Sequence, residues 1–234
     1  MPTLSILIPA FNEERTIGDV LGVLTRLELV GGVAKEIIVV NDRSQDGTAK
    51  VVSAFKEANP HAAIALIEQP VNRGKGAAIH RGIAAATGDW LIVQDADLEL
   101  DPAEINTLLQ PVLSGEATVV YGNRFALGLP YAGYPLRSYR ANKFLTWLSN
   151  RTTGLGLGDM EVCYKLMPTA VAKSLRLREQ RFGFEPEVTA QLAKVKGLKW
   201  AQVPIRYTAR THDQGKKIGW KDGLRAVWCI VRNA

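Results

Sequence analysis

The sequence predicts an α/β protein in which helices flank a mostly parallel sheet, as in Rossmann-like folds. Within residues 1–100, short apolar runs alternate with segments of helical period, and this alternation is typical of βαβ units. The chain is 47% hydrophobic and 22% charged, which is ordinary for a globular protein. A length of 234 residues is enough for one such domain.

Each element of the first half follows from its own pattern. Apolar runs predict strands at residues 4–8, 36–40, 63–67 and 90–93. Apolar side chains at helical spacing predict helices at 17–27 and 77–86, and a helix after residue 48 that carries Val51, Val52 and Phe55 on one side. Parallel strands joined by helices require right-handed crossovers, so the four strands are expected to point in one direction.

Polar loops follow all four predicted strands. Ligands of open α/β sheets bind outside the carboxyl ends of the strands, and every one of these loops begins at that edge. We therefore expect Glu13, Asp42, Lys75 and the acids that follow the fourth strand to surround one crevice.

Three acids, Asp95, Asp97 and Glu99, follow the fourth strand at alternate positions. Alternate side chains of an extended chain leave on the same face, so these carboxylates are expected to converge. Hard oxygen donors suit Mg²⁺ or Mn²⁺, which commonly hold the phosphates of a substrate. The alternative for an Asp-x-Asp alone is a solvated acidic turn, and the neighbouring polar loops favour the metal site over it.

Several function classes are disfavoured by what the sequence lacks. The pattern Gly74-x-Gly76 follows the third strand, and the first strand-to-helix turn has no GxGxxG, so a nicotinamide dehydrogenase is disfavoured. No Walker A sequence occurs, which disfavours a P-loop enzyme. Zinc-finger spacing and RNP-like motifs are missing too, and we expect no nucleic-acid partner.

The charge and cysteine content predict a cellular setting. The net charge is +6, and much of the excess lies late in the chain, which fits phosphate-bearing substrates or a membrane surface. Cys163 and Cys229 lie far apart and read as reduced residues. No apolar run approaches the ~20 residues that span a bilayer. We expect a cytoplasmic protein, soluble or peripheral at the inner membrane face.

Four stretches together resemble the motifs of family 2 glycosyltransferases, in the subgroup of dolichyl-phosphate mannose synthase and its bacterial polyprenyl-phosphate relatives. They are Ser-Ile-Leu-Ile-Pro-Ala-Phe-Asn-Glu-Glu, Ile-Ile-Val-Val-Asn-Asp-Arg-Ser-Gln-Asp-Gly-Thr, Asn-Arg-Gly-Lys-Gly and Gln-Asp-Ala-Asp-Leu-Glu. The resemblance implies a GT-A fold in a single domain over 1–234. It divides the chain into a nucleotide-sugar and metal half at 1–125, an acceptor half at 126–219 and a basic amphipathic segment at 220–234.

The resemblance also implies a donor site for a nucleotide-diphosphate sugar. The residues that it assigns to this donor are Pro9, Phe11, Glu13, Val40, Asp42, Lys75, Asp95, Ala96 and Asp97. Asp95, Asp97 and Glu99 would hold Mg²⁺ or Mn²⁺. Phe11, Asn41 and Arg43 stand where relatives have Tyr, an acid and Gly, and the base, uracil or guanine, therefore stays open.

The second half is expected to bind the acceptor. Arg124 ends a strand-like run at 119–124, while Arg137 and Arg140 share one face of a helix that suits a phosphate. A solvated basic helix is the alternative for this pair. Asp159 stands where inverting members of the family keep an acid that faces the acceptor. The alternative for it is a cap or a turn.

The last part of the chain is basic. In relatives, a loop at the position of 207–218 carries an Arg and a Lys that close over the diphosphate, and Arg210 and Lys216 hold these places. Residues 220–234 give a basic amphipathic helix, suited either to a membrane surface or to packing on the domain.

Together these features predict an inverting, metal-dependent glycosyltransferase. It would move a sugar from a GDP- or UDP-sugar to a polyprenyl or dolichyl phosphate, with Asp159, Arg210 and Lys216 as catalytic residues. One alternative is a family 2 enzyme that uses a sugar or protein hydroxyl. A non-catalytic nucleotide-sugar sensor is an alternative from another class. A sugar nucleotidylyltransferase is disfavoured, because residues 9–12 do not resemble its glycine-rich loop.

Overall fold

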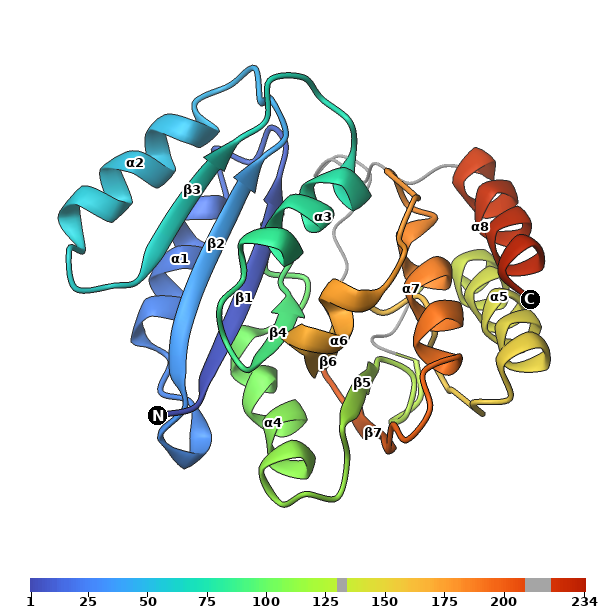
Figure 1. Cartoon of the computed structure of the whole chain (residues 1–234). Coiled ribbons are helices and arrows are strands. Elements are labelled where there is room, and N and C mark those ends of the chain that lie inside the picture. Colours follow the sequence, from blue (N-terminus) through green and yellow to red (C-terminus); the bar gives the residue numbers. More distant parts are fainter. Residues whose placement is uncertain (130–133, 209–219) are drawn as a thin grey trace.

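A seven-stranded sheet forms the centre of the molecule (Figure 1). The computed structural model describes residues 1–129, 134–208 and 220–234. The sheet has the strand order β3-β2-β1-β4-β6-β5-β7. Its strands are β1 (Thr3–Ala10), β2 (Ala34–Asn41), β3 (Ile64–Glu68), β4 (Trp90–Val93), β5 (Val119–Asn123), β6 (Lys165–Pro168) and β7 (Trp200–Pro204).

Helices connect most of these strands. They are α1 (Ile17–Arg26), α2 (Thr48–Ala58), α3 (Lys75–Ala85), α4 (Ile105–Leu113), α5 (Leu136–Thr153), α6 (Thr169–Ser174), α7 (Phe184–Ala193) and α8 (Trp220–Asn233). Two short 3₁₀ helices, η1 (Val30–Gly32) and η2 (Pro102–Glu104), complete the described elements. In the described parts of the chain, no helix combines the length and apolar character needed to cross a membrane.

The first four strands are parallel, as their sequence predicts. β1 pairs with β2 on one side and with β4 on the other, and β2 pairs with β3. Their carboxyl ends point toward the top of Figure 1, where the loops of the site lie. α3 lies in front of these strands and α1 behind them. The predicted α/β sheet flanked by helices is confirmed.

Of the other three strands, β5 falls on the strand-like run expected at 119–124, whereas β6 and β7 were not assigned from the sequence. β6 runs antiparallel to both β4 and β5, so it joins the two halves of the chain in one sheet. β5 in turn pairs parallel with β7 at the far edge. The sheet is therefore mixed rather than wholly parallel.

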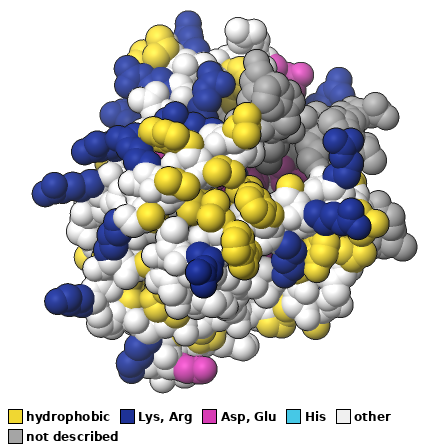
Figure 2. Space-filling view, turned by 90° about the vertical axis from the view of Figure 1, so that its right-hand side faces the viewer, with side chains coloured by type: hydrophobic (Ala, Val, Ile, Leu, Met, Phe, Trp, Pro, Cys, Tyr) yellow, Lys and Arg dark blue, Asp and Glu magenta, His cyan; other side chains and the backbone are white. Residues whose placement is uncertain are grey.

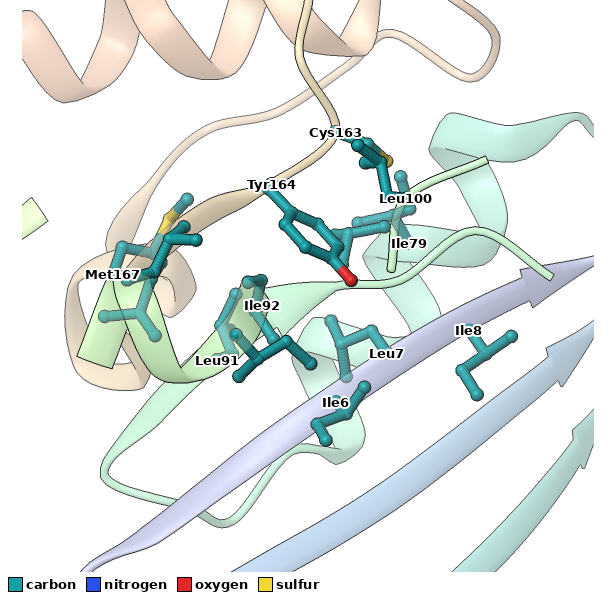
Figure 3. Close-up of a cluster of buried hydrophobic side chains, with 14 of the residues drawn as sticks. Ile6, Leu7, Ile8, Ile79, Leu91, Ile92, Leu100, Cys163, Tyr164 and Met167 are labelled. Atoms are coloured by element: carbon teal, nitrogen blue, oxygen red, sulfur yellow. The ribbon is translucent and has the colours of Figure 1, made fainter. Parts of the chain in front are cut away.

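The core lies on both faces of β1, whose residues Leu4, Ile6, Leu7 and Ile8 are fully buried. Such complete burial explains the continuous apolar run in its sequence. Figure 3 shows Leu7, Leu91 and Ile92 from β1 and β4 gathered below the ring of Tyr164. Tyr164 comes from the segment before β6, and its ring therefore seals the core where the two halves meet.

α5 holds the loop that follows it. Asn150 donates to the Leu157 carbonyl and accepts from the Leu157 amide, both at 2.8 Å. Lys143 donates to the Gly158 carbonyl at 3.0 Å, and the Met160 amide donates to Thr146 at 3.1 Å. One side of α5 thus fixes residues 157–160 beside β5.

Candidate functional site

A cavity of about 430 Å³ opens at the carboxyl ends of the parallel strands. It is lined by Pro9, Ala10, Phe11, Glu13, Asp42, Asn72, Gly74, Lys75, Ala78, Asp95, Ala96, Asp97, Glu99, Arg181, Phe182 and Tyr207. These residues include every predicted donor residue except Val40. The side chain of Val40 is buried in β2, because this part of the strand lies inside the core, and a contact of Val40 with the donor stays a prediction.

The three acids line this cavity, but not through the extended geometry expected from the sequence. β4 ends at Val93, and the chain bends from Ala96 to Leu100. Asp97 accepts a hydrogen bond from the Glu99 amide at 3.0 Å, which is the local turn that aspartate side chains favour. A turn, rather than strand alternation, therefore brings the acids to one cavity.

Each acid is also held by a neighbour. Asp95 lies 2.6 Å from the Lys75 ammonium, and Glu99 accepts from the Tyr207 hydroxyl at 2.9 Å. Within the described residues, no group of three or more metal-ligating side chains is already gathered as a metal site. Mg²⁺ is usually bound through one or two carboxylates together with substrate phosphates, and Asp95, Asp97 and Glu99 supply oxygen donors of that kind.

Lys75 places a positive charge at the wall of the cavity. Burial alone would lower its pKa, but the Asp95 carboxylate, with contributions from Cys163 and Glu185, raises the pKa well above its ordinary value. Lys75 also donates to the Cys163 sulfur at 3.2 Å. The ammonium therefore stays charged at neutral pH, next to an acid that the sequence assigns to the donor.

Two buried polar residues that were not predicted from the sequence hold the acid loop in place. Gln94 is fully buried and donates to the carbonyls of Asp95 (3.1 Å), Asp97 (3.4 Å) and Leu100 (3.4 Å). Its side-chain oxygen accepts from the Tyr164 hydroxyl. A glutamine directly after a buried strand was the available signal for Gln94, whereas nothing in the sequence pointed to Tyr164.

Asp42 holds the loop that leads into α3. Its carboxylate accepts from the Gly74 amide (2.7 Å), the Arg73 amide (2.9 Å) and the Gln69 side chain (2.7 Å). Asp42 was predicted to contact the donor's base, and it does line the cavity. Asp42 also has a structural role, because its hydrogen bonds to the Arg73 and Gly74 amides fix the glycine loop next to the predicted base site.

The glycine loop requires its glycines for two reasons. Gly74 has φ +99°, a conformation that residues with a Cβ rarely adopt. A Cβ at Gly76 would lie 2.3 Å from the Glu179 carbonyl, so no side chain fits there. This close approach lets the 179–182 segment of the second half reach the cavity, where Arg181 and Phe182 form part of the wall.

Arg43 has φ +61°. The left-handed region is unfavourable for residues with a Cβ. Arg43 therefore places backbone strain in the loop after β2.

Arg124 and Asp159 pair with each other. The Arg124 side chain donates to both carboxylate oxygens of Asp159, at 2.6 and 2.8 Å, and the Arg124 amide adds a bond of 3.2 Å. Asp159 is fully buried. In the amide orientation that satisfies its neighbours, Asn142 of α5 donates to Asp159 and accepts from Arg124. Arg124 and Asp159 therefore bind each other, whereas the sequence led us to expect that each would face the acceptor by itself.

A chain of contacts connects this pair to the acid loop. The Arg124 guanidinium lies over the Tyr207 ring, 5.2 Å from its centroid, and Tyr207 donates to Glu99. Neither Arg124 nor Asp159 lines the cavity itself. Arg137 and Arg140 are exposed on α5 and do not line it either, while Arg210 and Lys216 lie outside the described residues.

A buried charged cluster lies behind Asp159. Lys165 pairs with Glu185 and also donates to the Val162 carbonyl. Burial, partly offset by Lys165, raises the pKa of Glu161 to about 7. One oxygen of Glu161 is buried without a hydrogen-bond partner in the described structure. Glu161 was not among the predicted site residues.

Sequence comparison places the chain among known proteins. The family model described as glycosyl transferase family 2 matches residues 5–175. A dolichyl-phosphate β-glucosyltransferase of Trichomonas vaginalis is 29% identical over 87% of this chain and 65% of its own length. The enzyme of that name from Dictyostelium discoideum is 26% identical over 88% of this chain and 66% of its own length. The chain thus spans slightly less than two thirds of these curated relatives.

Solved structures share the fold. Glucosyl-3-phosphoglycerate synthase from Mycobacterium tuberculosis in complex with UDP has a TM-score of 0.74 and 23% identity, over 99% of this chain and 80% of that chain. The synthase with Mn²⁺, UDP-glucose and phosphoglyceric acid has a TM-score of 0.74 and 22% identity, over 99% and 79%. At this level of identity the likeness establishes the fold alone, which is the predicted GT-A fold.

Proposed function

Because this chain belongs to glycosyl transferase family 2, we propose that it transfers glucose, with inversion, from UDP-glucose to a polyprenyl phosphate. The curated relatives are named for β-glucosyl transfer to dolichyl phosphate, which supports both the acceptor class and inversion. UDP-glucose is bound in a structure of the same fold, which supports uracil over guanine as the base.

The observation that carries the proposal is the single cavity that combines the acid loop with the donor residues. Phe11 and Glu13 follow β1, Asp42 follows β2, and Asp95 and Asp97 follow β4. This is the edge where open α/β sheets bind nucleotides. Phe11, Glu13 and Asp42 fit a nucleoside. Asp95 and Asp97 would then lie next to its diphosphate.

A divalent cation fits the chemistry of this acid loop. Asp95, Asp97 and Glu99 would hold Mg²⁺ or Mn²⁺ there, and the bound cation would neutralise the departing diphosphate. Lys75 keeps Asp95 paired beside the cavity. Arg210 and Lys216 remain the proposed cations that close over the diphosphate.

The Arg124–Asp159 pair supports a phosphate acceptor. Both carboxylate oxygens of Asp159 already accept hydrogen bonds from Arg124, which makes Asp159 poorly placed to take a proton from a hydroxyl. A phosphate monoester is already ionised near neutral pH, because its second pKa is ~6 by analogy with phosphorylated side chains. Its oxygen therefore attacks the sugar carbon without a general base. The proposed contacts to the acceptor phosphate remain Arg124, Arg137 and Arg140. In this role, Arg124 would bind the phosphate while it stays paired with Asp159.

Direct transfer tests the proposal. The protein is incubated with radiolabelled UDP-glucose, Mn²⁺ and a short polyprenyl phosphate, and the extracted lipid is assayed for sugar. We expect a lipid-linked glucose from the wild type. The rate of Asp97→Asn should be at least about a hundredfold lower, which is the usual effect of removing one group that stabilises charge in the transition state. Full activity of Asp97→Asn, or no lipid product from a protein that binds UDP-glucose, would contradict the proposal.

The variant Asp159→Asn separates the two acceptor classes. With a phosphate acceptor it should retain appreciable turnover, because no proton has to be removed. If the acceptor is a sugar or protein hydroxyl, the neutral group needs a base, and the same variant should be nearly inactive. Circular dichroism of the variant shows whether the unpaired Arg124 disturbs folding.

A further inference from the structure

α5 and α8 pack side by side at the end of the molecule remote from β3 (Figure 1). Both helices turn large apolar side chains outward. On α5, Leu136, Phe144 and Trp147 are 56%, 51% and 57% exposed, and on α8, Leu224, Trp228 and Val231 are 62%, 44% and 61% exposed. We call these six residues the α5–α8 surface.

Spacing along each helix gathers these side chains into stripes. Leu136, Phe144 and Trp147 recur at intervals that keep them on one side of α5, and Leu224, Trp228 and Val231 do so on α8. Figure 2 shows apolar side chains gathered in the middle of this end of the molecule. An exposed patch of this kind marks a contact with a partner or a membrane.

Arginines accompany both stripes. Arg137, Arg140 and Arg151 are exposed on α5, and Arg225 and Arg232 on α8. Of these, Arg225 forms an ion pair with Glu179 at 2.8 Å. α5 contains no acidic residue over its whole length. The guanidinium groups of Arg225 and Arg232 lie 4.2 and 4.7 Å from the centroid of the Trp228 ring. Lys and Arg side chains surround the apolar centre in Figure 2, with few acids among them.

We propose that the α5–α8 surface rests on an anionic lipid bilayer. Tryptophan side chains favour the depth of the headgroups, and arginines extend from an apolar contact to reach the phosphates. Basic amphipathic helices bind such surfaces through burial of their apolar side and through attraction of their positive charges to anionic lipids. The inference deepens the proposed function and rests on it for its biological role, because it names the surface that brings the protein to a lipid acceptor.

Charge favours a bilayer over a second copy of this chain. In a two-fold symmetric dimer the same patch meets itself, so the arginines of α5 would face one another, together with Arg232 of α8, whereas Arg225 is already paired with Glu179. Juxtaposed like charges disfavour association, and the acids needed to offset them are missing from α5. An anionic membrane supplies the opposite charge together with an apolar interior.

α5 also contacts the second half of the site through side chains outside the exposed stripe. Asn142 contacts Arg124 and Asp159, and Lys143 and Asn150 hold the loop that contains Asp159. Docking through the outer side of α5 would therefore place the Arg124–Asp159 pair one helix away from the bilayer. A lipid phosphate in that bilayer would have a short path to it.

Vesicle binding without donor or acceptor tests the surface separately from sugar transfer. The full chain is sedimented with vesicles of phosphatidylcholine alone or mixed with phosphatidylserine. We expect binding to the mixed vesicles and a loss of about tenfold per aromatic side chain for Phe144→Ser/Trp147→Ser, on the scale of buried apolar area. The matched control Val71→Ser/Leu113→Ser removes exposed apolar side chains elsewhere and should bind as the wild type does.

The charges are tested in the same assay. Arg140→Gln/Arg151→Gln should weaken binding to the mixed vesicles about fivefold per arginine. Lys50→Gln/Lys56→Gln on α2, at the other end of the molecule (Figure 1), should have no effect. The proposal is overturned if the wild type binds neither vesicle, if the control pairs lose binding equally, or if Phe144→Ser/Trp147→Ser instead dissociates a dimer in sedimentation equilibrium.

Glucose transfer to a short polyprenyl phosphate in detergent measures catalysis without a membrane. A variant of the α5–α8 surface that loses vesicle binding should keep its rate in detergent, since Phe144 and Trp147 do not line the cavity. Failure of transfer in every form of the protein would refute the proposed function and leave the vesicle result standing.

Discussion

At the scale of single residues, Glu161 is the group whose charge the fold opposes. Burial, despite the nearby positive charge of Lys165, raises its pKa from 4.5 to about 7. One carboxylate oxygen is buried without a hydrogen-bond partner among the described residues. The native protein therefore holds a proton on Glu161 that the unfolded chain releases near its ordinary pKa.

The stability of the protein should fall as pH rises through this interval. Because the folded pKa is above the unfolded one, the stabilisation is fully present below about pH 4.5 and is lost by about pH 7. Glu161→Gln removes the titration and should exceed the wild type by about 3 kcal/mol at about pH 8, with little difference at about pH 4. Urea unfolding at both values measures it.

A control at an exposed acid isolates the effect of burial. Glu116→Gln lies on the surface and should change stability equally at both pH values. Parallel pH profiles for the wild type and Glu161→Gln would show that Glu161 is ionised in the native state, contrary to this prediction.

At the scale of elements, the acid loop after β4 depends on a residue from the other half of the chain. The Tyr164 hydroxyl donates to Gln94, and Gln94 holds three carbonyls of the loop. The loop is thus positioned by a contact between segments that are distant in sequence, while the acids themselves face the cavity.

Removing this hydroxyl should loosen the loop. Tyr164→Phe leaves the buried oxygen of Gln94 without its donor, which costs about 1–3 kcal/mol of stability. Mn²⁺-dependent UDP binding should weaken too, and isothermal titration calorimetry measures the loss. Tyr139→Phe, on α5, is the matched control, since its ring contacts Phe125 and its hydroxyl has no hydrogen bond within the described residues. Equal losses in both variants would argue against a role of Gln94 in holding the loop.

Some of the strands and helices could be predicted from the sequence, and others could not. The strands β1 to β4 and helices α1 to α3 were predicted because complete burial gives β1 a continuous apolar run, and one buried side gives α1 its period. β6 was not predicted, because four residues carry too little pattern and its pairing with β4 and β5 is long-range.

The candidate site divides in the same way. The predicted site residues Phe11, Glu13, Asp42, Lys75 and the three acids all follow predicted strands, and the topology of the sheet brings these loops to one edge. A local turn then directs the acids to the cavity. The pairing of Arg124 with Asp159 was not predictable, because it depends on how α5 fixes the loop after it. Arg181 and Phe182 reach the cavity only through the close approach at Gly76.

At the scale of the whole molecule, the cavity is built from both halves of the chain. Phe11 and Asp97 come from the first half, whereas Phe182 and Tyr207 come from the second. A ligand in this cavity contacts both, and it binds only the state in which they are assembled. Ligand binding should therefore stabilise the two halves as one unit.

UDP with Mn²⁺ should raise the unfolding midpoint in a single transition. A ligand at a hundredfold its Kd adds about 2.7 kcal/mol to the free energy of unfolding. Thermal unfolding with UDP, GDP, ADP and CDP, each with Mn²⁺, compares the bases, and we expect the largest shift from UDP. A larger shift with GDP would assign guanine instead, and no shift with any nucleotide would count against the donor site.

The antiparallel pairing of β6 with β4 also sets an order of events during synthesis. β1, β2 and β3 can pair as soon as they leave the ribosome, and β4 then joins β1. The other edge of β4 must wait until Lys165 to Pro168 have been made. An open strand edge invites pairing with other chains, and nascent chains elongate at about 5–20 residues per second. The nascent first half is thus the stage of synthesis at which a chaperone has the most to protect.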